Sequence, residues 1–286
     1  MLITIVTVCY NAEFCIEKTM QSVLSQTYPD IEYIIKDGGS TDRTNEIIEQ
    51  YREEFQQRGI KFGHSIQKDN GIYDAMNQAT KEASGEYIIY MNADDIFFDR
   101  NVICRIFDGG KSSEDVIYGD AVCEYEFIKG RREYTLWQGQ HQCFITMPIS
   151  HQACFIKTET IKRCCYDTKY KIAADFDLIV KLFKSGKTFK NAHCIVALCT
   201  MDGISHTNCV ASYNEAIQVR KELGREEYSK GDNSFNIWLM KVKQWMMDSL
   251  PYWFVGRLLR FQMNRKGTRI FASLEAVLSV YEGDLI

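Results

Sequence analysis

Short apolar runs alternate with amphipathic stretches through the first hundred residues of the chain. Three runs are rich in β-branched and aromatic residues and predict buried strands, namely residues 2–8, 31–35 and 86–91, with a weaker strand at 61–65. The stretches between them carry apolar residues at helical spacing, and they predict helices at residues 13–26, 44–54 and from 72 to about 85. Strands that alternate with helices in this way indicate βαβ units and a parallel sheet.

Polar clusters that contain aspartate follow three of these four strands. Asp37 follows the second strand, Asp69 follows the weak third strand, and the pair Asp94 and Asp95 follows the fourth. Parallel strands place their carboxyl ends along one edge of the sheet, where ligands bind in open α/β folds. Adjacent carboxylates at that edge suit a hard divalent cation, Mn²⁺ or Mg²⁺, that bridges to a phosphate. The alternative for Asp94 and Asp95 is a solvated turn, but the convergence of three acidic clusters favours a ligand site.

The second half of the chain has a less regular pattern. Apolar runs predict a strand at residues 116–119, a hairpin of 121–128 with 132–136, and a short strand at 153–156. Residues from 171 to about 185 predict a helix that Gly186 ends. Asp175 and Asp177 would lie in its first turn, where the helix dipole favours negative charge, so capping of this helix is one explanation for both acids.

The composition is that of an ordinary globular protein, with 45% hydrophobic and 25% charged residues among 286. The net charge of −4 gives no case for general nucleic-acid binding. The eleven cysteines form no C-x-x-C pair, so we expect no zinc cluster and interpret most of them as small buried residues in a reducing cytoplasm. The sequence begins with a strand-like run and has no apolar run near ~20 residues, so we expect neither a signal peptide nor a membrane-spanning helix.

Six short motifs occur in order along residues 1–225. They are Tyr10-Asn11-Ala12, Asp37-Gly38-Gly39-Ser40-Thr41-Asp42, Asp69-Asn70-Gly71-Ile72-Tyr73-Asp74-Ala75-Met76-Asn77, Asn92-Ala93-Asp94-Asp95, His151-Gln152-Ala153 and Ala173-Ala174-Asp175-Phe176-Asp177. Together they resemble glycosyltransferase family two, of the bacterial polysaccharide-biosynthesis type. The resemblance implies an inverting enzyme with the GT-A fold, an α/β fold that is Rossmann-like and has a mostly parallel central sheet flanked by helices. It also implies a catalytic domain at residues 1–225, with a nucleotide-sugar half at about 1–100 and an acceptor half at about 101–225.

The resemblance assigns roles to residues at the strand ends. The nucleotide would be bound by Tyr10, Asn11, Asp37, Asp69, Gly71 and Asp94. Asp37 would accept a hydrogen bond from the base, the turn at residues 69–71 would lie beside the nucleotide and the sugar, and Asp94 would contact the ribose. Asp95 would hold Mn²⁺ or Mg²⁺, because position 92 is Asn where many related enzymes have the first Asp of an Asp-x-Asp motif.

Asp175 would be the general base of the transfer. Such a base takes the proton of the acceptor hydroxyl as that hydroxyl attacks the sugar, while a divalent cation stabilises the charge on the departing diphosphate. A single in-line displacement inverts the anomeric centre and needs no carboxylate nucleophile. Three further residues are secondary candidates: His151 and Asp177 for contact with the acceptor, and His206 for contact with the diphosphate or the metal. The alternatives are a structural histidine at 151, a helix cap at 177 and a solvated loop histidine at 206.

Residues 226–286 differ in character from the rest of the chain. Between residues 236 and 270 there are seven basic residues, a single acid at Asp248, and three tryptophans at 238, 245 and 253. Basic and aromatic residues on helix-like stretches predict a helical tail that binds a membrane surface, which would suit a lipid-linked acceptor. The alternative is a helical hairpin packed on the catalytic domain or on a second subunit of a homodimer.

The sequence therefore predicts a metal-dependent hexosyltransferase. It would move a sugar from a nucleotide diphosphate donor, with UDP as the default, to a hydroxyl of a glycan or lipid-linked acceptor in surface-polysaccharide synthesis. We expect the protein in the cytoplasm, where peripheral binding to the inner face of the cytoplasmic membrane would be a second location. Two alternatives stay open: a nucleotidyltransferase, which would need a Gly-rich phosphate loop with a basic residue after the first strand, and a non-catalytic nucleotide-sugar binding module.

Overall fold

The computed structural model describes the chain except for residues 108, 109, 111, 141–146, 201–207, 223, 225–233, 251, 266, 267 and 284–286. The chain forms two compact units. The first unit comprises residues 1–121 with 139–198, and the second comprises residues 122–138 with 199–286. These two units are defined by contacts between residues, so they do not test the boundary of the catalytic domain that was predicted at residue 225. That boundary stays a prediction.

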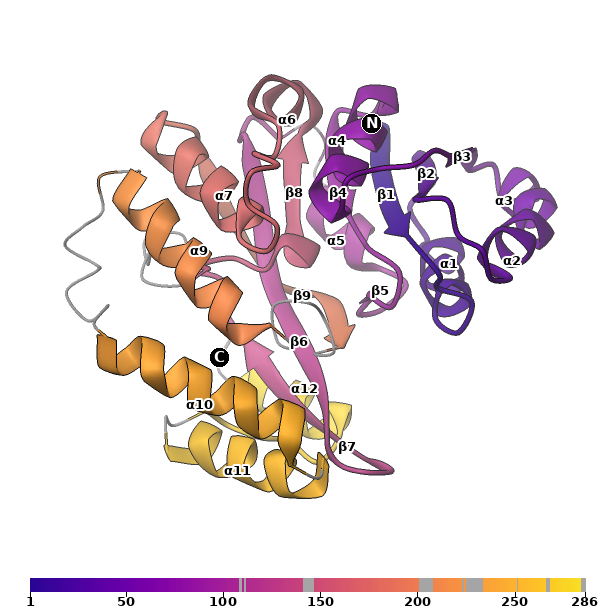
Figure 1. Cartoon of the computed structure of the whole chain (residues 1–286). Helices are drawn as coiled ribbons and strands as arrows, with labels where there is room; N and C mark the ends of the chain where they lie inside the picture. The colour runs from indigo at the N-terminus through magenta and orange to yellow at the C-terminus, as the bar shows by residue number, and fades with distance from the viewer. Residues whose placement is uncertain are drawn as a thin grey trace. The chain divides into compact units, whose positions relative to one another are not determined.

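A parallel arrangement of four strands forms one half of the sheet in the first unit (Figure 1). These strands are β1 (Ile3–Cys9), β2 (Ile31–Asp37), β3 (Lys61–Ile66) and β4 (Tyr87–Tyr90), in the spatial order β3-β2-β1-β4. The pairs β1–β2, β1–β4 and β2–β3 are all parallel, which confirms the parallel sheet predicted from the alternation of strands and helices. Their carboxyl ends therefore lie along one edge.

Further strands continue the sheet beyond β4. They are β8 (Cys154–Lys157), β6 (Val116–Ile128), β9 (Phe189–Thr200) and β5 (Ile96–Phe97), and β7 (Arg131–Trp137) pairs with β6. The pairs β4–β8, β8–β6 and β9–β5 are antiparallel. The hairpin of β6 and β7 was predicted. The separate strand predicted at residues 116–119 is instead the first part of β6, which continues without a break. Asp120, which lies between the two predicted strands, is buried within β6 and accepts a hydrogen bond from the Gly139 N–H at 2.9 Å.

Helices cover the parallel half of the sheet. They include α1 (Ile16–Leu24), α2 (Thr44–Gln50), α3 (Arg52–Gln57), α4 (Ile72–Glu82) and α5 (Val102–Phe107), and the first unit also holds α6 (Thr158–Cys164) and α7 (Ala174–Lys184). Every residue of β1 and β2 is buried, so both faces of the sheet are covered there. The helix predicted at residues 44–54 is two helices, because the Tyr51 N–H bonds to the Ile48 carbonyl at 3.2 Å and this three-residue step ends α2.

Close approach of two backbones places β4 beside β1. A Cβ at Gly85 would lie only 2.6 Å from the Thr4 nitrogen and 2.9 Å from the Leu2 carbonyl oxygen, both backbone atoms. Only glycine fits this contact, which sits directly before β4. The position therefore helps to set the register of the strand that delivers Asp94 and Asp95 to the edge.

The second unit contains the C-terminal helical region. Its helices are α9 (Cys209–Glu222), α10 (Ser234–Ser249), α11 (Tyr252–Arg265) and α12 (Leu274–Gly283). Helix α10 packs on α9 and on α11, and α12 packs on β7. Among the residues described, none of the helices is both long and apolar enough to cross a membrane.

Candidate active site

The ends of the first three strands meet at one point of the sheet edge. Cys9 is the register partner of Asp37, the last residue of β2. A Cβ built on Gly38 would lie 2.8 Å from Oδ2 of Asp69, which follows β3, and 3.4 Å from a ring carbon of Tyr10, which follows β1. The sheet thus brings together polar residues from three strands, and the absence of a side chain at position 38 leaves room for this contact.

Asp37 shapes the turn that follows β2. Its Oδ1 accepts hydrogen bonds from the N–H groups of Gly39 and Ser40 at 2.8 and 2.7 Å, and its Oδ2 accepts one from the Ser40 hydroxyl at 2.5 Å. Burial acts to raise the pKa of this carboxyl, but the bonds from Ser40 and its neighbours outweigh burial, and the pKa lies below the usual range. Asp37 is therefore an ionised acceptor inside the fold, and this side chain has no exposed surface.

Lys36 joins the second and third strand ends, a role that the sequence reasoning missed. The side chain is buried, and its Nζ donates to Oδ2 of Asp69 at 2.7 Å and to the Gln67 carbonyl at 2.5 Å. A buried ammonium is costly unless it is paired, so these contacts hold the 67–69 segment against β2. The available signal was a basic residue directly after the predicted strand and next to Asp37.

Tyr10, Asn11 and Gly71 lie in the connecting loops of this edge. The Tyr10 ring is 64% exposed, so it is accessible to a ligand. Asn11 has φ 50°, its N–H donates to the Ser40 hydroxyl at 2.7 Å, and its Oδ1 accepts from the Thr41 N–H at 2.9 Å. Gly71 has φ 117° directly before α4, a conformation that favours glycine, and its N–H donates to Oδ1 of Asp69 at 3.0 Å.

The segment after β4 is held by α1. Asp94 has φ 91°, which costs a non-glycine residue about 1–2 kcal/mol. Its carboxylate forms an ion pair with Lys18, and its N–H donates to the Thr19 hydroxyl at 3.0 Å. Asp95, the next residue, is 7% exposed. Both acids thus follow β4 at the shared edge, as the sequence predicted for their position.

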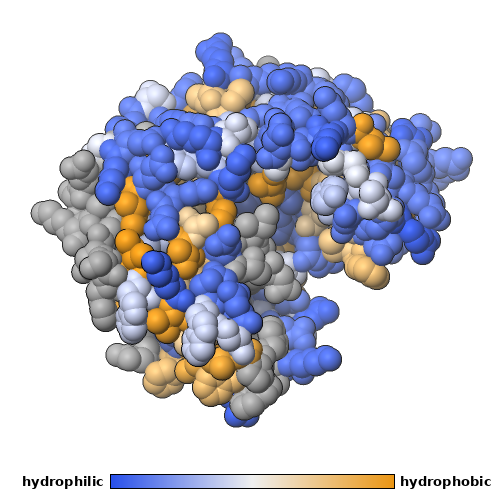
Figure 2. Space-filling view, in the orientation of Figure 1, coloured by the Kyte–Doolittle hydropathy of each residue, from blue (hydrophilic) through white to orange (hydrophobic). Residues whose placement is uncertain are grey.

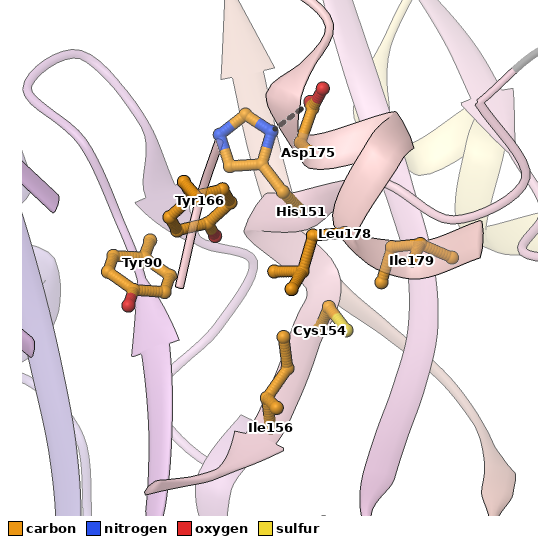
Figure 3. Close-up of a pocket in the computed structure, with 8 residues that line it drawn as sticks. All are labelled: Tyr90, His151, Cys154, Ile156, Tyr166, Asp175, Leu178 and Ile179. Atoms are coloured by element: carbon orange, nitrogen blue, oxygen red, sulfur yellow. Dashed lines mark ion pairs between the residues drawn. The ribbon is translucent and has the colours of Figure 1, made fainter. Parts of the chain in front are cut away.

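A chain of contacts runs from this segment to Asp175 through His151, and Figure 3 shows its second half, the ion pair between His151 and Asp175. The amide Nδ2 of Asn92 lies 3.2 Å from Nε2 of His151, and Nδ1 of the same ring lies 3.3 Å from Oδ2 of Asp175. Strand β8 explains this meeting, because it runs antiparallel to β4 and so brings the residue that precedes it to the carboxyl end of β4. Burial lowers the pKa of His151, but the hydrogen bond to Asp175 and the charges of Asp175 and Asp95 outweigh burial and raise the pKa above its usual value.

Both nitrogens of the His151 ring therefore face protein groups. With an ionised carboxylate on Nδ1, the neutral ring carries its proton there and accepts from the Asn92 amide at Nε2. A small cavity of about 10 Å³ lies beside the pair, with Tyr90, Tyr166 and Leu178 among its lining residues. This volume is about that needed for one water molecule.

Asp175 and Asp177 have different surroundings although both lie in the first turn of α7. Two residues along a helix project about 200° apart. The carboxylate of Asp177 is buried and forms an ion pair with Lys181 at 2.6 Å, so the structure does not bring it to His151. Both acids lie in the first turn of α7, where negative charge is favoured, but neither is the N-cap residue, which is Ala173.

Helix α4 holds the segment that leads to Asp175, which the sequence reasoning also missed. The Asn77 amide donates to the Tyr166 carbonyl and accepts from the Tyr166 N–H, both at 2.9 Å. The Tyr73 hydroxyl donates to the Ile172 carbonyl at 2.6 Å. Both side chains belong to the motif at residues 69–77, so the signal was present in the sequence, but the partners lie about ninety residues or more further along.

The donor atoms near Asp95 fit a divalent cation. No cluster of three or more His, Cys, Asp or Glu side chains that could hold a metal occurs in the described ranges. The buried Oδ1 of Asn92 has no hydrogen-bond partner, and it belongs to the same segment as the carboxylate of Asp95. One or two protein oxygens match Mg²⁺ or Mn²⁺ sites in which substrate phosphates supply further ligands. His206, the other predicted residue, lies outside the residues described.

The fold with its acid-bearing strand ends is that of a GT-A glycosyltransferase, as the sequence predicted. The structure of Staphylococcus aureus TarS 1–349 in complex with UDP-GlcNAc matches with a TM-score of 0.61 at 18% identity, over 86% of this chain and 79% of that chain. The mannosyltransferase PcManGT from Pyrobaculum calidifontis, in complex with GDP-Man and Mn²⁺, matches with a TM-score of 0.60 at 14% identity, over 99% of this chain and 79% of that chain.

The family model for glycosyl transferase family 2 matches residues 4–152, more than half of the chain. The protein therefore belongs to glycosyltransferase family 2, and the predicted family is confirmed. A PGL/p-HBAD biosynthesis glycosyltransferase of Mycobacterium tuberculosis is 25% identical over 219 residues, which are 75% of this chain and 83% of that relative. The putative teichuronic acid biosynthesis glycosyltransferase TuaG of Bacillus subtilis is 35% identical over 94 residues, 33% of this chain and 36% of that relative.

The Asn77 contacts give a test of how α4 positions the segment before α7. In Asn77→Ala both hydrogen bonds to Tyr166 are lost, so we expect kcat to fall by about ten-fold or more, as misplacement of a reacting group does. Binding of UDP, which would use the other strand ends, should change by less than about two-fold. Steady-state kinetics and calorimetry measure the two effects.

Lys81→Ala is the matched control, because Lys81 is an exposed residue of the same helix. Equal losses of kcat in the two variants, or a loss of UDP binding in Asn77→Ala as large as the loss of kcat, would contradict this positioning role.

Proposed function

We propose that the protein transfers a sugar from a nucleotide diphosphate donor, with UDP as the nucleotide, to a hydroxyl of a glycan or lipid-linked acceptor, with inversion at the anomeric carbon. One observation carries this proposal: a path of contacts connects the acid-bearing end of β4 to Asp175 through Asn92 and His151. A donor site at the strand ends and a base at Asp175 would then adjoin at a single sheet edge, which supports the proposal.

The strand ends supply the groups that a nucleotide needs. The exposed Tyr10 ring offers a surface for the base, and the Asp69 carboxylate lies near it as a hydrogen-bond acceptor. Asp37 has no exposed surface, so it would hold the turn that borders the base through its bonds to Gly39 and Ser40. The turns that begin at Asn11 and Gly71 and the carboxylate of Asp94 would line the ribose and the sugar. The TarS structures with UDP and with UDP-GlcNAc support UDP as the nucleotide, and the PcManGT complex keeps GDP as an alternative.

Asp95 would hold a divalent cation, with the Asn92 Oδ1 as a further oxygen donor. Mn²⁺ or Mg²⁺ at this place would offset the negative charge that develops on the departing diphosphate. The Mn²⁺ present in the PcManGT complex supports this choice. The low exposure of Asp95 favours the role, because a carboxylate shielded from water attracts a cation more strongly than an exposed one does.

Asp175 would act as the general base. The acceptor oxygen forms a bond to the anomeric carbon as the bond from that carbon to the diphosphate oxygen breaks, and the hydroxyl proton passes to the Asp175 carboxylate. His151 would hold this carboxylate through its Nδ1–H, and the Asn92 amide would fix the ring through Nε2. His151 is then a positioning residue, since both its nitrogens already face protein groups.

The acceptor class is inferred from the relatives. TuaG is named for teichuronic acid biosynthesis, and a poly-β-1,6-N-acetyl-D-glucosamine synthase of Staphylococcus epidermidis is 36% identical over 91 residues, which are 32% of this chain. Both names concern bacterial glycans, so we infer a surface polysaccharide or its lipid-linked precursor as the acceptor. A cytoplasmic location, where the cysteines would stay reduced, is part of this proposal.

Family membership favours this reading over a nucleotidyltransferase, because the matched family transfers sugars. A non-catalytic nucleotide-sugar binding module is distinguished by experiment. The module would bind UDP through the same strand ends but would need no base at position 175.

Asp175→Asn should lower turnover by about 10²–10⁴-fold, the contribution of a positioned acid or base. The affinity for UDP should stay within about two-fold, since the substitution leaves the strand-end residues unchanged. Transfer from UDP-sugars and UDP binding by calorimetry measure the two quantities. Glu159→Gln, which neutralises an exposed carboxylate on α6, should have wild-type turnover. Unchanged turnover in Asp175→Asn would refute its assignment as the base.

Removal of the metal gives a separate test of Asp95. In the wild-type protein, Mn²⁺ should tighten UDP binding by about ten-fold or more relative to EDTA, which corresponds to about 1.4 kcal/mol. Asp95→Asn should abolish this difference while the melting temperature without ligand stays close to that of the wild type. Calorimetric titrations with and without EDTA make the comparison. Tight UDP binding that is indifferent to EDTA in the wild-type protein would count against a metal at Asp95.

A further inference from the structure

Helix α10 presents an aromatic and basic stripe at its surface. Trp238 and Trp245 are 55% and 60% exposed, and the exposed Lys241 lies between them. Residues separated by three or four positions, and by seven, share one side of a helix. The three side chains therefore form a continuous stripe along α10 that includes two of the protein's four tryptophans.

Helix α11 repeats the same arrangement. Phe254 and Phe261 are 40% and 61% exposed, and the exposed Arg257 lies between them. The spacing of aromatic, cation and aromatic is identical to that on α10, with intervals of three and four residues. The two helices pack on each other and are joined by a short connection, so the paired stripes belong to one helical hairpin.

The charge of this hairpin is opposite to that of the whole protein. The segment Ser234–Arg265 contains five basic residues and one acid, Asp248, whereas the chain has a formal net charge of −4. Arg260 is used internally, because it pairs with the buried Glu133 of β7 at 2.9 Å. By sequence count the segment stays basic without Arg260, with four cations and one acid. On the face shown in Figure 2, apolar and pale side chains gather over α9 and α10 among hydrophilic ones.

These features fit a lipid surface better than a second copy of the chain. Exposed aromatic residues on soluble domains mark an interaction site, and aromatic side chains with a polar edge are favoured at the boundary between lipid and water. Cations near an anionic membrane contribute about 1 kcal/mol each. A symmetric contact through the same hairpin would instead bring like charges together, which opposes dimer formation.

We propose that the hairpin of α10 and α11 is a peripheral membrane-binding surface that recognises anionic lipid headgroups. The aromatic rings would enter the interfacial layer while Lys241 and Arg257 contact lipid phosphates, so that the hairpin lies in the plane of the membrane. The inference stands on the surface of these two helices alone and does not require the proposed transfer reaction. If that reaction is correct, the surface would give the enzyme access to a lipid-linked acceptor.

The test is co-sedimentation of the full-length protein with vesicles. We expect binding to vesicles of phosphatidylglycerol and phosphatidylcholine in equal parts, and binding at least about ten-fold weaker to pure phosphatidylcholine. The double variant Lys241→Glu/Arg257→Glu should lose about ten-fold or more of the affinity for the anionic vesicles. Arg163→Glu/Lys190→Glu, which changes the net charge equally at exposed positions outside the hairpin, should retain most of it.

Trp245→Ala and Phe261→Ala give a second measurement that leaves the charge unchanged. Each should weaken binding to the anionic vesicles by several-fold, because an aromatic ring is lost from the interfacial layer. Circular dichroism would verify that every variant keeps the wild-type fold. No binding to anionic vesicles at low salt, equal losses in the two charge-reversal variants, or a dimer in light scattering that Trp245→Ala dissociates would each overturn the proposal.

Discussion

The parallel register of three strands is the constraint on which the candidate site depends. Cys9 pairs with Asp37 across β1 and β2, and Val6 pairs with Tyr90 across β1 and β4. This register fixes the loops after the strands at one edge, although up to about eighty residues separate them in the chain. A shift of one residue would turn every side chain of a strand to the opposite face, so burial of both sheet faces also protects the geometry of the edge.

Antiparallel pairing of β8 with β4 completes the arrangement by adding a different part of the chain to the same edge. It places His151 beside Asn92, and the first turn of α7 then brings Asp175 to the other side of the imidazole ring. Helix α4 supports this contact, because the side chains of Asn77 and Tyr73 form hydrogen bonds with the backbone that leads into α7. Hydrogen bonds within the first unit therefore couple α4 and the end of β4 to the segments that carry His151 and Asp175. The placement of Asp175, the proposed base, would then depend on residues that need not touch either substrate.

The sequence was sufficient to predict the first four strands, their parallel direction and the acids that follow three of them, because these follow from local apolar patterns and from the chirality of βαβ units. It did not show how Lys36, Tyr73 and Asn77 are used. Their partners are backbone carbonyls or a carboxylate of distant segments, and no local pattern reports such a contact. The continuity of β6 was missed for a related reason: Asp120 is polar, but tertiary structure supplies its hydrogen-bond donor. The placement of His151 beside Asp175 likewise follows from strand direction, which the short apolar run at 153–156 could not reveal.

The central claim is that separate strand ends form one nucleotide site, and hydrogen–deuterium exchange measures this directly. With UDP and Mn²⁺ bound, amides in residues 9–12, 37–41, 69–71 and 92–95 should all exchange more slowly, because ligand binding stabilises the edge against local opening. Helices α10 and α11 should show no such change. Protection of a single strand end, or protection confined to segments away from this edge, would contradict the account.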